Sequence, residues 1–350
     1  MNKKYQNGFF IFGMAVLGLM ITQLDFAEVW SDLQHTGYWF LAVLGLWCVL
    51  YVFNTAAWYL IIKAGAKSES PLQGQRREKV GFWWLYKLTV SGFALNYATP
   101  GGLMGGEPYR VMSLAPKIGT ERASSSVILY AMTHIFSHFW FWLISIPLYL
   151  LTQPLNVLTA LMLAIGGAFC GLGLWFFISG YRKGLAVRAM NLLRHIPFVK
   201  KWAGPFIDRH RGELDTIDCQ IAALHRQSRA TFIAAVGLEL TCRLLSALEI
   251  YFILLVILPE VSYIQCVLIL SFTSLFANLL FFIPLQLGGR EGGFLMSATG
   301  LGIATSAGIF VALIVRMREL LLTGVGLLLI KLGSSATAVR DKEERNEPKA

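Results

Sequence analysis

The chain has 350 residues, of which 56% are hydrophobic and 14% charged, and its mean hydropathy is +0.59. Because soluble domains carry about a quarter charged residues, this composition excludes a soluble globular protein and predicts an all-α polytopic membrane protein. The net charge of +10 does not indicate nucleic-acid binding, since basic residues gather in the cytoplasmic loops of membrane proteins. The five cysteines form no CxxC pair, so neither a zinc site nor a disulfide framework is predicted.

Apolar runs long enough to cross a bilayer recur along the chain, since a transmembrane helix needs about 20 such residues. Residues 301–332 are also apolar but contain Arg316, Arg318 and Glu319, which fits either two short helices or one long helix with buried charge. We therefore expect about 6–8 transmembrane helices. The clearest candidate spans are Tyr5–Leu24, Trp39–Ile62, Ser124–Leu151, Leu155–Ser179, Thr231–Leu258 and Tyr263–Ile283.

The distribution of basic residues predicts the orientation. Lys3 and Lys4, the basic segment 63–79 and the loop 180–230 should all be cytoplasmic. Two spans separate the last two segments, so the intervening residues 82–115 must cross the membrane an even number of times. This parity favours a re-entrant hairpin that enters from the cytoplasm, although an ordinary surface loop is the alternative.

The re-entrant segment contains TPGGLMGGEPYR, residues 99–110, and a related stretch, IPLQLGGREGG, lies within residues 278–300. In each, a proline stands seven residues before an acid, a Gly-Gly pair comes just before the acid, and an arginine lies nearby. Paired, interrupted apolar segments are typical of the midplane site of a transporter. We expect two glycine-rich hairpins that line a cavity. They are either inverted repeats or a chance likeness in a glycine-rich chain.

Charged groups at such a site suit a lipid headgroup. Arginine guanidinium groups bind phosphate oxygens, glycine N–H groups allow close approach of an anion, and an intramembrane glutamate can pair with a cation or take up a proton. The alternative is that the charges only hold the hairpins, with Glu107 paired to Arg110, and Glu291 paired to Arg290 or Arg318. The candidate substrate-binding residues are Glu107, Arg110, Arg290, Glu291, Gly105, Gly106, Gly288, Gly289, Arg318, Glu239 and Arg243.

Other polar residues carry weaker predictions. Glu239 and Arg243 share a helix face, which fits either a local ion pair or a groove lining. His134 and His138 are four residues apart, but no HExxH pattern or third ligand accompanies them, so hydrogen-bonded bundle histidines are favoured over a metal site. Neither a Walker A motif nor a nucleophile pattern is present. The sequence therefore predicts no catalytic residues, metal or cofactor.

Together these motifs resemble the transmembrane flippase region of lysylphosphatidylglycerol synthases. The resemblance rests on PGGxxGGExxR at 100–110, ERAxxS from Glu121, PxxxGGxE at 284–291 and RELLLTG from Arg318. The second motif reads PLQLGG where the family more often has PGGxG. The resemblance implies lipid transport between leaflets of a prokaryotic plasma membrane, and it favours Arg318 as a functional residue.

We therefore expect one flippase-like membrane domain over residues 1–338, a disordered charged tail at 339–350, and a phospholipid or lipid-linked substrate. No synthase domain follows the membrane region, so we do not expect an enzyme. An intramembrane lipid-modifying enzyme and a non-transporting scaffold are the alternatives. The sequence does not address oligomeric state.

Overall fold

The computed structural model describes residues 36–68, 79–98, 105–183, 229–279 and 289–346, together with positions 11 and 212. In these ranges the regular structure is α-helical and no strand occurs. The all-α polytopic class is thereby confirmed. The expected first span and the basic loop fall outside the described residues, apart from the ends of that loop.

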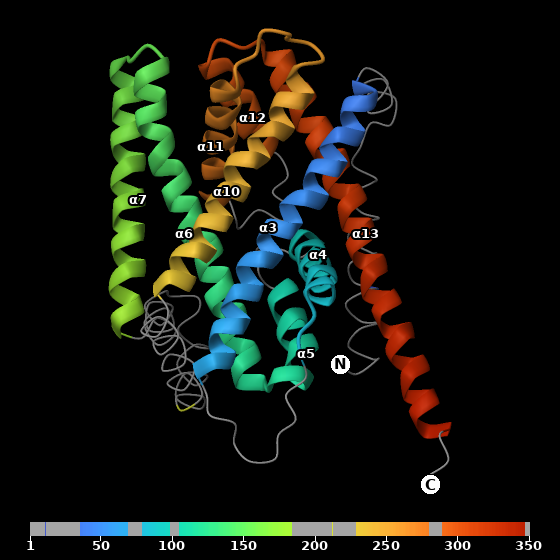
Figure 1. Cartoon of the computed structure of the whole chain (residues 1–350). Helices are drawn as coiled ribbons and strands as arrows, with labels where there is room; N and C mark the ends of the chain where they lie inside the picture. Colours follow the sequence, from blue (N-terminus) through green and yellow to red (C-terminus); the bar gives the residue numbers. More distant parts are fainter. Residues whose placement is uncertain are drawn as a thin grey trace, which may run out of the picture. The chain divides into compact units, whose positions relative to one another are not determined.

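Long apolar helices appear where the hydropathy predicts them (Figure 1). Within the described residues, four helices are long and apolar enough to cross a membrane, namely α3, α6, α7 and α10. The helix α11 is shorter and also apolar. The helices are α3 Tyr38–Ser68, α4 Phe82–Ala98, α5 Gly106–Ile118, α6 Thr120–Thr152, α7 Val157–Lys183, α10 Arg229–Leu254, α11 Tyr263–Leu279, α12 Gly289–Gly300 and α13 Thr305–Asn346.

The helix α13 answers the open question about residues 301–332. They form a short turn followed by one continuous helix in which Arg316, Arg318 and Glu319 are buried. The helix also continues to Asn346, so most of the segment expected to be a disordered tail is helical. The run RDKEER consists largely of strong helix formers, which explains how a charged sequence continues the helix.

Each glycine-rich stretch lies where one short helix ends and another begins, and residues 99–104 and 280–288 between these helices lie outside the described residues. The first lies between α4 and α5, and the second lies between α11 and α12. At about 1.5 Å per residue, α4 and α5 are about 26 and 20 Å long, each less than the roughly 30 Å hydrocarbon core. These lengths agree with the predicted hairpins, whose placement in a bilayer remains a prediction.

The chain divides into two compact units. Unit 1 comprises Met1–Tyr51, Trp83–Ser113 and Ser246–Ala350, and unit 2 comprises Val52–Phe82 and Leu114–Leu245. Unit 1 therefore contains the described residues of both glycine-rich motifs.

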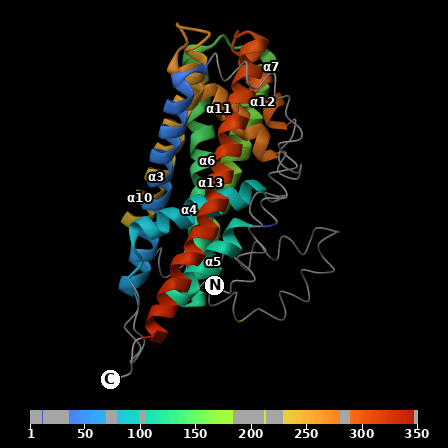
Figure 2. The same cartoon turned by 90° about the vertical axis from the view of Figure 1, so that its right-hand side faces the viewer.

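In unit 1, α13 packs against α12 and crosses α4 (Figure 2). A Cβ atom at Gly326 would collide with the Cβ of Ala94, and the Ser91 Oγ donates a hydrogen bond to the Gly326 carbonyl at 3.1 Å. Small residues let membrane helices approach this closely. In unit 2, α6 and α7 form an antiparallel hairpin joined by a short turn, and aromatic pairs such as Phe139–Phe177 fill their interface.

Candidate functional site

The first glycine-rich motif is held by an asparagine on α4. The Gly106 N–H donates to Asn96 Oδ1 at 2.7 Å, and Asn96 Nδ2 donates to Glu107 Oε1 at 3.0 Å. Asn96 thus supplies the acceptor that the first turn of α5 lacks. A Cβ atom at Gly106 would collide with the Gly92 carbonyl oxygen and the Asn96 side chain. Glycine at 106 is therefore required for this contact between α4 and α5.

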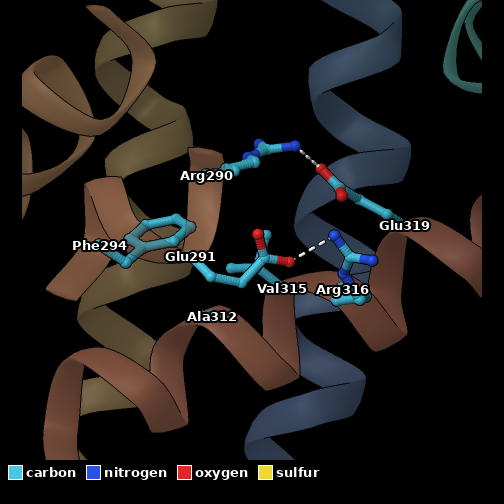
Figure 3. Close-up of a pocket in the computed structure, with 7 residues that line it drawn as sticks. All are labelled: Arg290, Glu291, Phe294, Ala312, Val315, Arg316 and Glu319. Carbon is cyan, nitrogen blue, oxygen red and sulfur yellow. Dashed lines mark hydrogen bonds and ion pairs between the residues drawn. The ribbon is translucent and has the colours of Figure 1, made fainter. Parts of the chain in front are cut away.

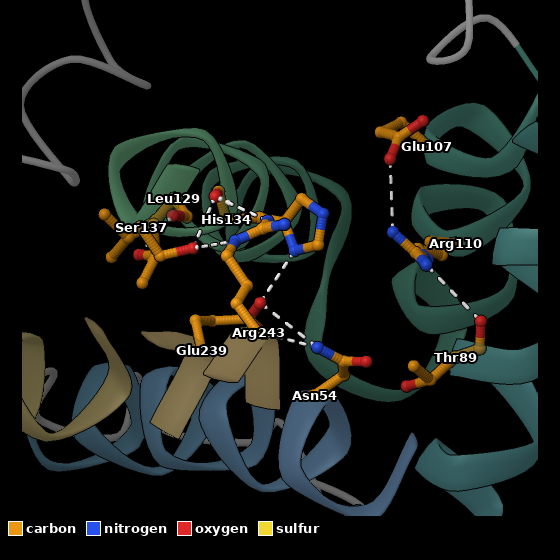
Figure 4. Close-up of polar contacts among 10 residues, drawn as sticks. Asn54, Thr89, Glu107, Arg110, Leu129, His134, Ser137, Glu239 and Arg243 are labelled. Atoms are coloured by element: carbon orange, nitrogen blue, oxygen red, sulfur yellow. Dashed lines mark hydrogen bonds and ion pairs between the residues drawn. The ribbon is translucent and has the colours of Figure 1, made fainter. Parts of the chain in front are cut away.

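Arg110 lies at the centre of this motif and is only 1% exposed. Its Nη1 donates to Glu107 Oε1 at 3.1 Å and its Nη2 donates to the Thr89 carbonyl at 3.3 Å (Figure 4). The guanidinium also stacks over the Phe93 ring, 4.7 Å from its centroid. This Glu107–Arg110 pair is the one expected from the alternative in which the charges only hold the hairpins. The second carboxylate oxygen of Glu107 is buried, with no hydrogen-bond partner in the described part of the chain.

The second motif lines a small pocket between α12 and α13 (Figure 3). Arg290 points across it to Glu319, and Glu291 points to Arg316, so that two ion pairs bridge the helices. The space among these side chains, its open side included, is about 180 Å³. The lining residues are Arg290, Glu291, Phe294, Ala312, Val315, Arg316 and Glu319.

The partner predicted for Glu291 was wrong. Glu291 pairs with Arg316 instead of Arg290 or Arg318. Residues 312, 315, 316 and 319 recur at intervals of three and four, which places them on one face of α13, and this face carries the pocket. Arg316 and Glu319 were recognised in the sequence as intramembrane charges, but this spacing is the signal that would have grouped them.

Arg318 contributes to a second network in unit 1, which adjoins the pocket because its Nη1 lies 3.6 Å from Glu319 Oε1. Its Nε donates to Glu249 Oε1 at 2.8 Å and its Nη2 donates to Glu249 Oε2 at 3.0 Å, which makes a buried bidentate pair. The Trp47 ring covers the guanidinium at 4.0 Å, and its Nε1 donates to Glu249 Oε2 at 2.9 Å. Arg318 is thus enclosed and does not line the pocket.

Glu239 and Arg243 belong to unit 2, where they connect α10 to α3 and α6 (Figure 4). Glu239 accepts hydrogen bonds from Asn54 Nδ2 at 3.0 and 3.1 Å, and its Oε2 lies 2.7 Å from His134 Nδ1. Arg243 donates to Ser137 Oγ at 2.7 Å and to the His134 carbonyl at 3.0 Å. The predicted bundle role of His134 agrees with these contacts. Among the described residues no group of three potential ligands could hold a metal ion.

The candidate residues therefore fall into separate places. Arg290 and Glu291 meet in the pocket, Glu107 and Arg110 pair between α4 and α5, and the other candidate charges lie in the networks just described. Of the glycines, Gly105 accepts a hydrogen bond from the Tyr109 N–H, Gly106 contacts α4, and Gly289 begins α12. Gly288 lies outside the described residues.

Comparison with known families gives one match. The family model described as "Lysylphosphatidylglycerol synthase TM region" matches residues 8–326, which is most of the chain and includes both glycine-rich motifs. Comparisons with curated proteins and with solved structures give no match.

Proposed function

The chain belongs to the family of lysylphosphatidylglycerol synthase transmembrane regions, and we propose that it is a flippase-like transporter that moves a phospholipid or lipid-linked headgroup between leaflets. The family places it among multi-pass membrane proteins of lipid modification or transport. The step from that class to flipping rests on the pocket between α12 and α13. A plasma membrane of a prokaryote, with a cytoplasmic N-terminus, is part of the same proposal.

The charges of the pocket support this function. Arg290 and Arg316 offer guanidinium groups to phosphate oxygens, and Glu291 and Glu319 offer carboxylates to an ammonium group. Glu291 and Arg290 are the more open members, with 35% and 27% of their side chains exposed, whereas Glu319 is 7% exposed. A headgroup would therefore meet Glu291 and Arg290 first and exchange their internal ion pairs for its own.

The size of the pocket limits what it holds. Ligand sites usually enclose about 300–1,000 Å³, whereas the space among these side chains is about 180 Å³ even with its open side included. With its ion pairs closed, the pocket has room for little more than a water molecule, so the charged part of a headgroup would enter only by displacing those pairs. The acyl chains would stay outside, in lipid. Phe294 supplies an apolar wall. This division is what transport of a lipid requires, because only the polar part needs shielding from hydrocarbon.

Glu107 is a second point of interaction. One of its oxygens is occupied by Arg110 and Asn96, while Oε2 has no hydrogen-bond partner in the described residues. A buried carboxylate oxygen without a donor is costly, and an ammonium group or a proton would satisfy it. Glu107 is accordingly proposed to act with the pocket during transport.

Leaflet exchange of headgroup-labelled lipids in liposomes containing the purified protein tests the proposal. The lipids should include anionic, zwitterionic, cationic and polyprenyl-linked headgroups. We expect the wild type to flip at least one of them, and Glu291→Gln and Glu107→Gln to lose that activity while remaining folded. Glu260→Gln is the matched control, because Glu260 is an exposed acid outside the pocket.

Other results would favour the alternatives. Absence of exchange for every headgroup would contradict a flippase. A change in the chemical composition of the lipids that depends on Glu107, Glu291 or the histidines would indicate an intramembrane enzyme. Activity in cells that survives both glutamate substitutions and fails when the basic loop 180–230 is neutralised would indicate a scaffold.

A further inference from the structure

The residues that line the pocket do not include the polar network of unit 2. In this network a fully buried acid lies beside a partly exposed histidine. The Glu239 side chain is 0% exposed, and the His134 side chain is 29% exposed. Three apolar helices enclose the pair, with α10 supplying Glu239, α6 supplying His134 and α3 supplying Asn54. Ionisable groups in such surroundings are costly and usually serve a function.

The hydrogen bonds around Glu239 indicate the protonation state of its carboxyl group. Asn54 Nδ2 donates to both carboxylate oxygens of Glu239, at 3.0 and 3.1 Å. An ionised carboxylate only accepts hydrogen bonds, so the amide fits the charged form on both oxygens. His134 Nδ1, 2.7 Å from Oε2, must then carry a hydrogen and donate it. The other ring nitrogen, Nε2, is left as the atom of this pair that gains or loses a proton.

The remaining charged and titratable groups around the pair are compatible with gain or loss of a proton at His134 Nε2. From α6 they are Tyr130 and His138, from α10 they are Cys242 and Arg243, and α3 contributes the neutral Asn54. Arg243 directs its guanidinium to Ser137 Oγ and to the His134 carbonyl. With His134 neutral, Arg243 and Glu239 balance one another. Addition of a proton to His134 gives this cluster a net positive charge next to a carboxylate that stabilises it.

We propose that His134 and Glu239 form a proton-binding site, and that proton binding there couples lipid movement to the proton gradient. The proton passes between water and Nε2 of His134, and no other bond is made or broken. Imidazole is the side chain that ordinarily changes charge between about pH 5 and 8. Its exposed fraction leaves a side from which a proton can reach the ring, while the buried Glu239 supplies the balancing charge. The coupling part of the proposal rests on the flippase function proposed above.

A purely structural role for the pair gives different expectations. A hydrogen bond that only fastens α6 to α10 needs a donor at the position of Nδ1 and no titration. Asparagine at position 134 carries an amide at about that position, so His134→Asn keeps a donor and removes the titrating ring. If His134→Asn does not fold, His134→Gln also removes the titrating ring, with its amide donor on a side chain one methylene longer.

Nuclear magnetic resonance of the labelled histidines tests proton binding without transport. The chain has six histidines, and His134→Asn identifies the signal of His134. We expect that signal to change with pH between about 5 and 8, and the transition to move in Glu239→Gln but not in the exposed control Glu260→Gln. A His134 signal that does not change with pH, or that is indifferent to Glu239→Gln, would overturn the site.

Lipid exchange under an imposed pH gradient tests coupling. We expect wild-type liposomes to flip lipid faster in one gradient direction than in the other, and His134→Asn to flip equally in both. Flipping by the wild type that ignores the gradient would overturn the coupling. If the wild type flips no lipid under any condition, the flippase function fails and coupling fails with it, while the histidine signal still decides whether the proton site exists.

Discussion

Individual charges in unit 1 have two different environments. Glu249 is 5% exposed and its two oxygens accept from Arg318 and Trp47, whereas Glu291 is 35% exposed and lines the pocket. Loss of one member of a buried ion pair leaves the other charge uncompensated, which costs about 3–5 kcal/mol. Exposed charges contribute little to stability. The first glutamate should therefore serve stability and the second transport.

The residue-scale prediction is that Glu249→Gln lowers the thermal unfolding temperature markedly, because Arg318 stays buried and keeps only the more distant carboxylate of Glu319, 3.6 Å from its Nη1. Glu291→Gln should lower it less, because Glu291 is partly exposed although its partner Arg316 is buried, and it should reduce lipid exchange. Thermal unfolding of both variants in detergent, beside the exposed control Glu260→Gln, makes the measurement. Equal losses of stability in Glu249→Gln and Glu291→Gln would contradict the division.

A second variant separates charge pairing from side-chain packing. Replacement of both partners by uncharged side chains removes the uncompensated charge. We therefore expect Glu249→Gln combined with Arg318→Met to be more stable than Glu249→Gln alone. A double variant less stable than either single variant would show that the packing of Arg318 against Trp47 matters more than its charge.

The sequence predicts local pairs better than distant ones. Glu107 and Arg110 are three residues apart on a helix, so their pairing follows from helical spacing. The partners of Glu291, Arg318 and Glu239 are 25, 69 and 105 residues away, and any of several intramembrane charges satisfied the composition equally well. Which charges pair depends on which faces of the helices meet, and that is decided by packing.

At the scale of the helix, close packing through glycine organises the α4–α5 motif and the contact between α4 and α13. Hydropathy was sufficient to predict the long apolar helices that the structure describes, whereas residues 99–104 and 280–288 of the two predicted breaks lie outside the described residues. The sequence alone did not show that Gly106 and Gly326 lie against α4. A glycine that contacts a neighbouring backbone produces no periodic pattern that sets it apart from the other glycines of the chain. Gly106 was expected to contact a headgroup, and in the structure it packs against α4.

Gly326→Ala is the corresponding prediction. The added methyl group would overlap the Ala94 side chain and approach the Val90 carbonyl, both backbone-proximal parts of α4. Overpacking of this kind typically costs about 1–3 kcal/mol, so the unfolding temperature should fall. Gly166→Ala in α7 is the matched control, because no atom lies within 4 Å of its added Cβ. A similar change in both variants would argue against close packing of α4 and α13.

At the scale of the whole molecule, the helix lengths agree with a membrane topology that the charge distribution predicts. The turn at residues 153–156 joins α6 to α7, so it should lie across the membrane from the beginning of α6. The α4–α5 segment decides whether the chain crosses the membrane an even or an odd number of times between the basic segment 63–79 and the beginning of α6. A re-entrant hairpin returns the chain to the side from which it came, whereas a single crossing does not.

Cysteine accessibility in intact cells distinguishes the two topologies. In a chain whose five native cysteines are replaced by alanine, Lys79→Cys precedes the hairpin, Thr120→Cys follows it, and Asn156→Cys lies in the turn between α6 and α7. We expect an impermeant reagent to label Asn156→Cys from outside, and to label the other two only after the membrane is opened. Because α4 and α5 are each shorter than the hydrocarbon core, a hairpin explains such a result. Labelling of Lys79→Cys and Thr120→Cys from opposite sides would instead show that the glycine-rich break interrupts a single crossing, and the parity that underlies the predicted orientation would be wrong.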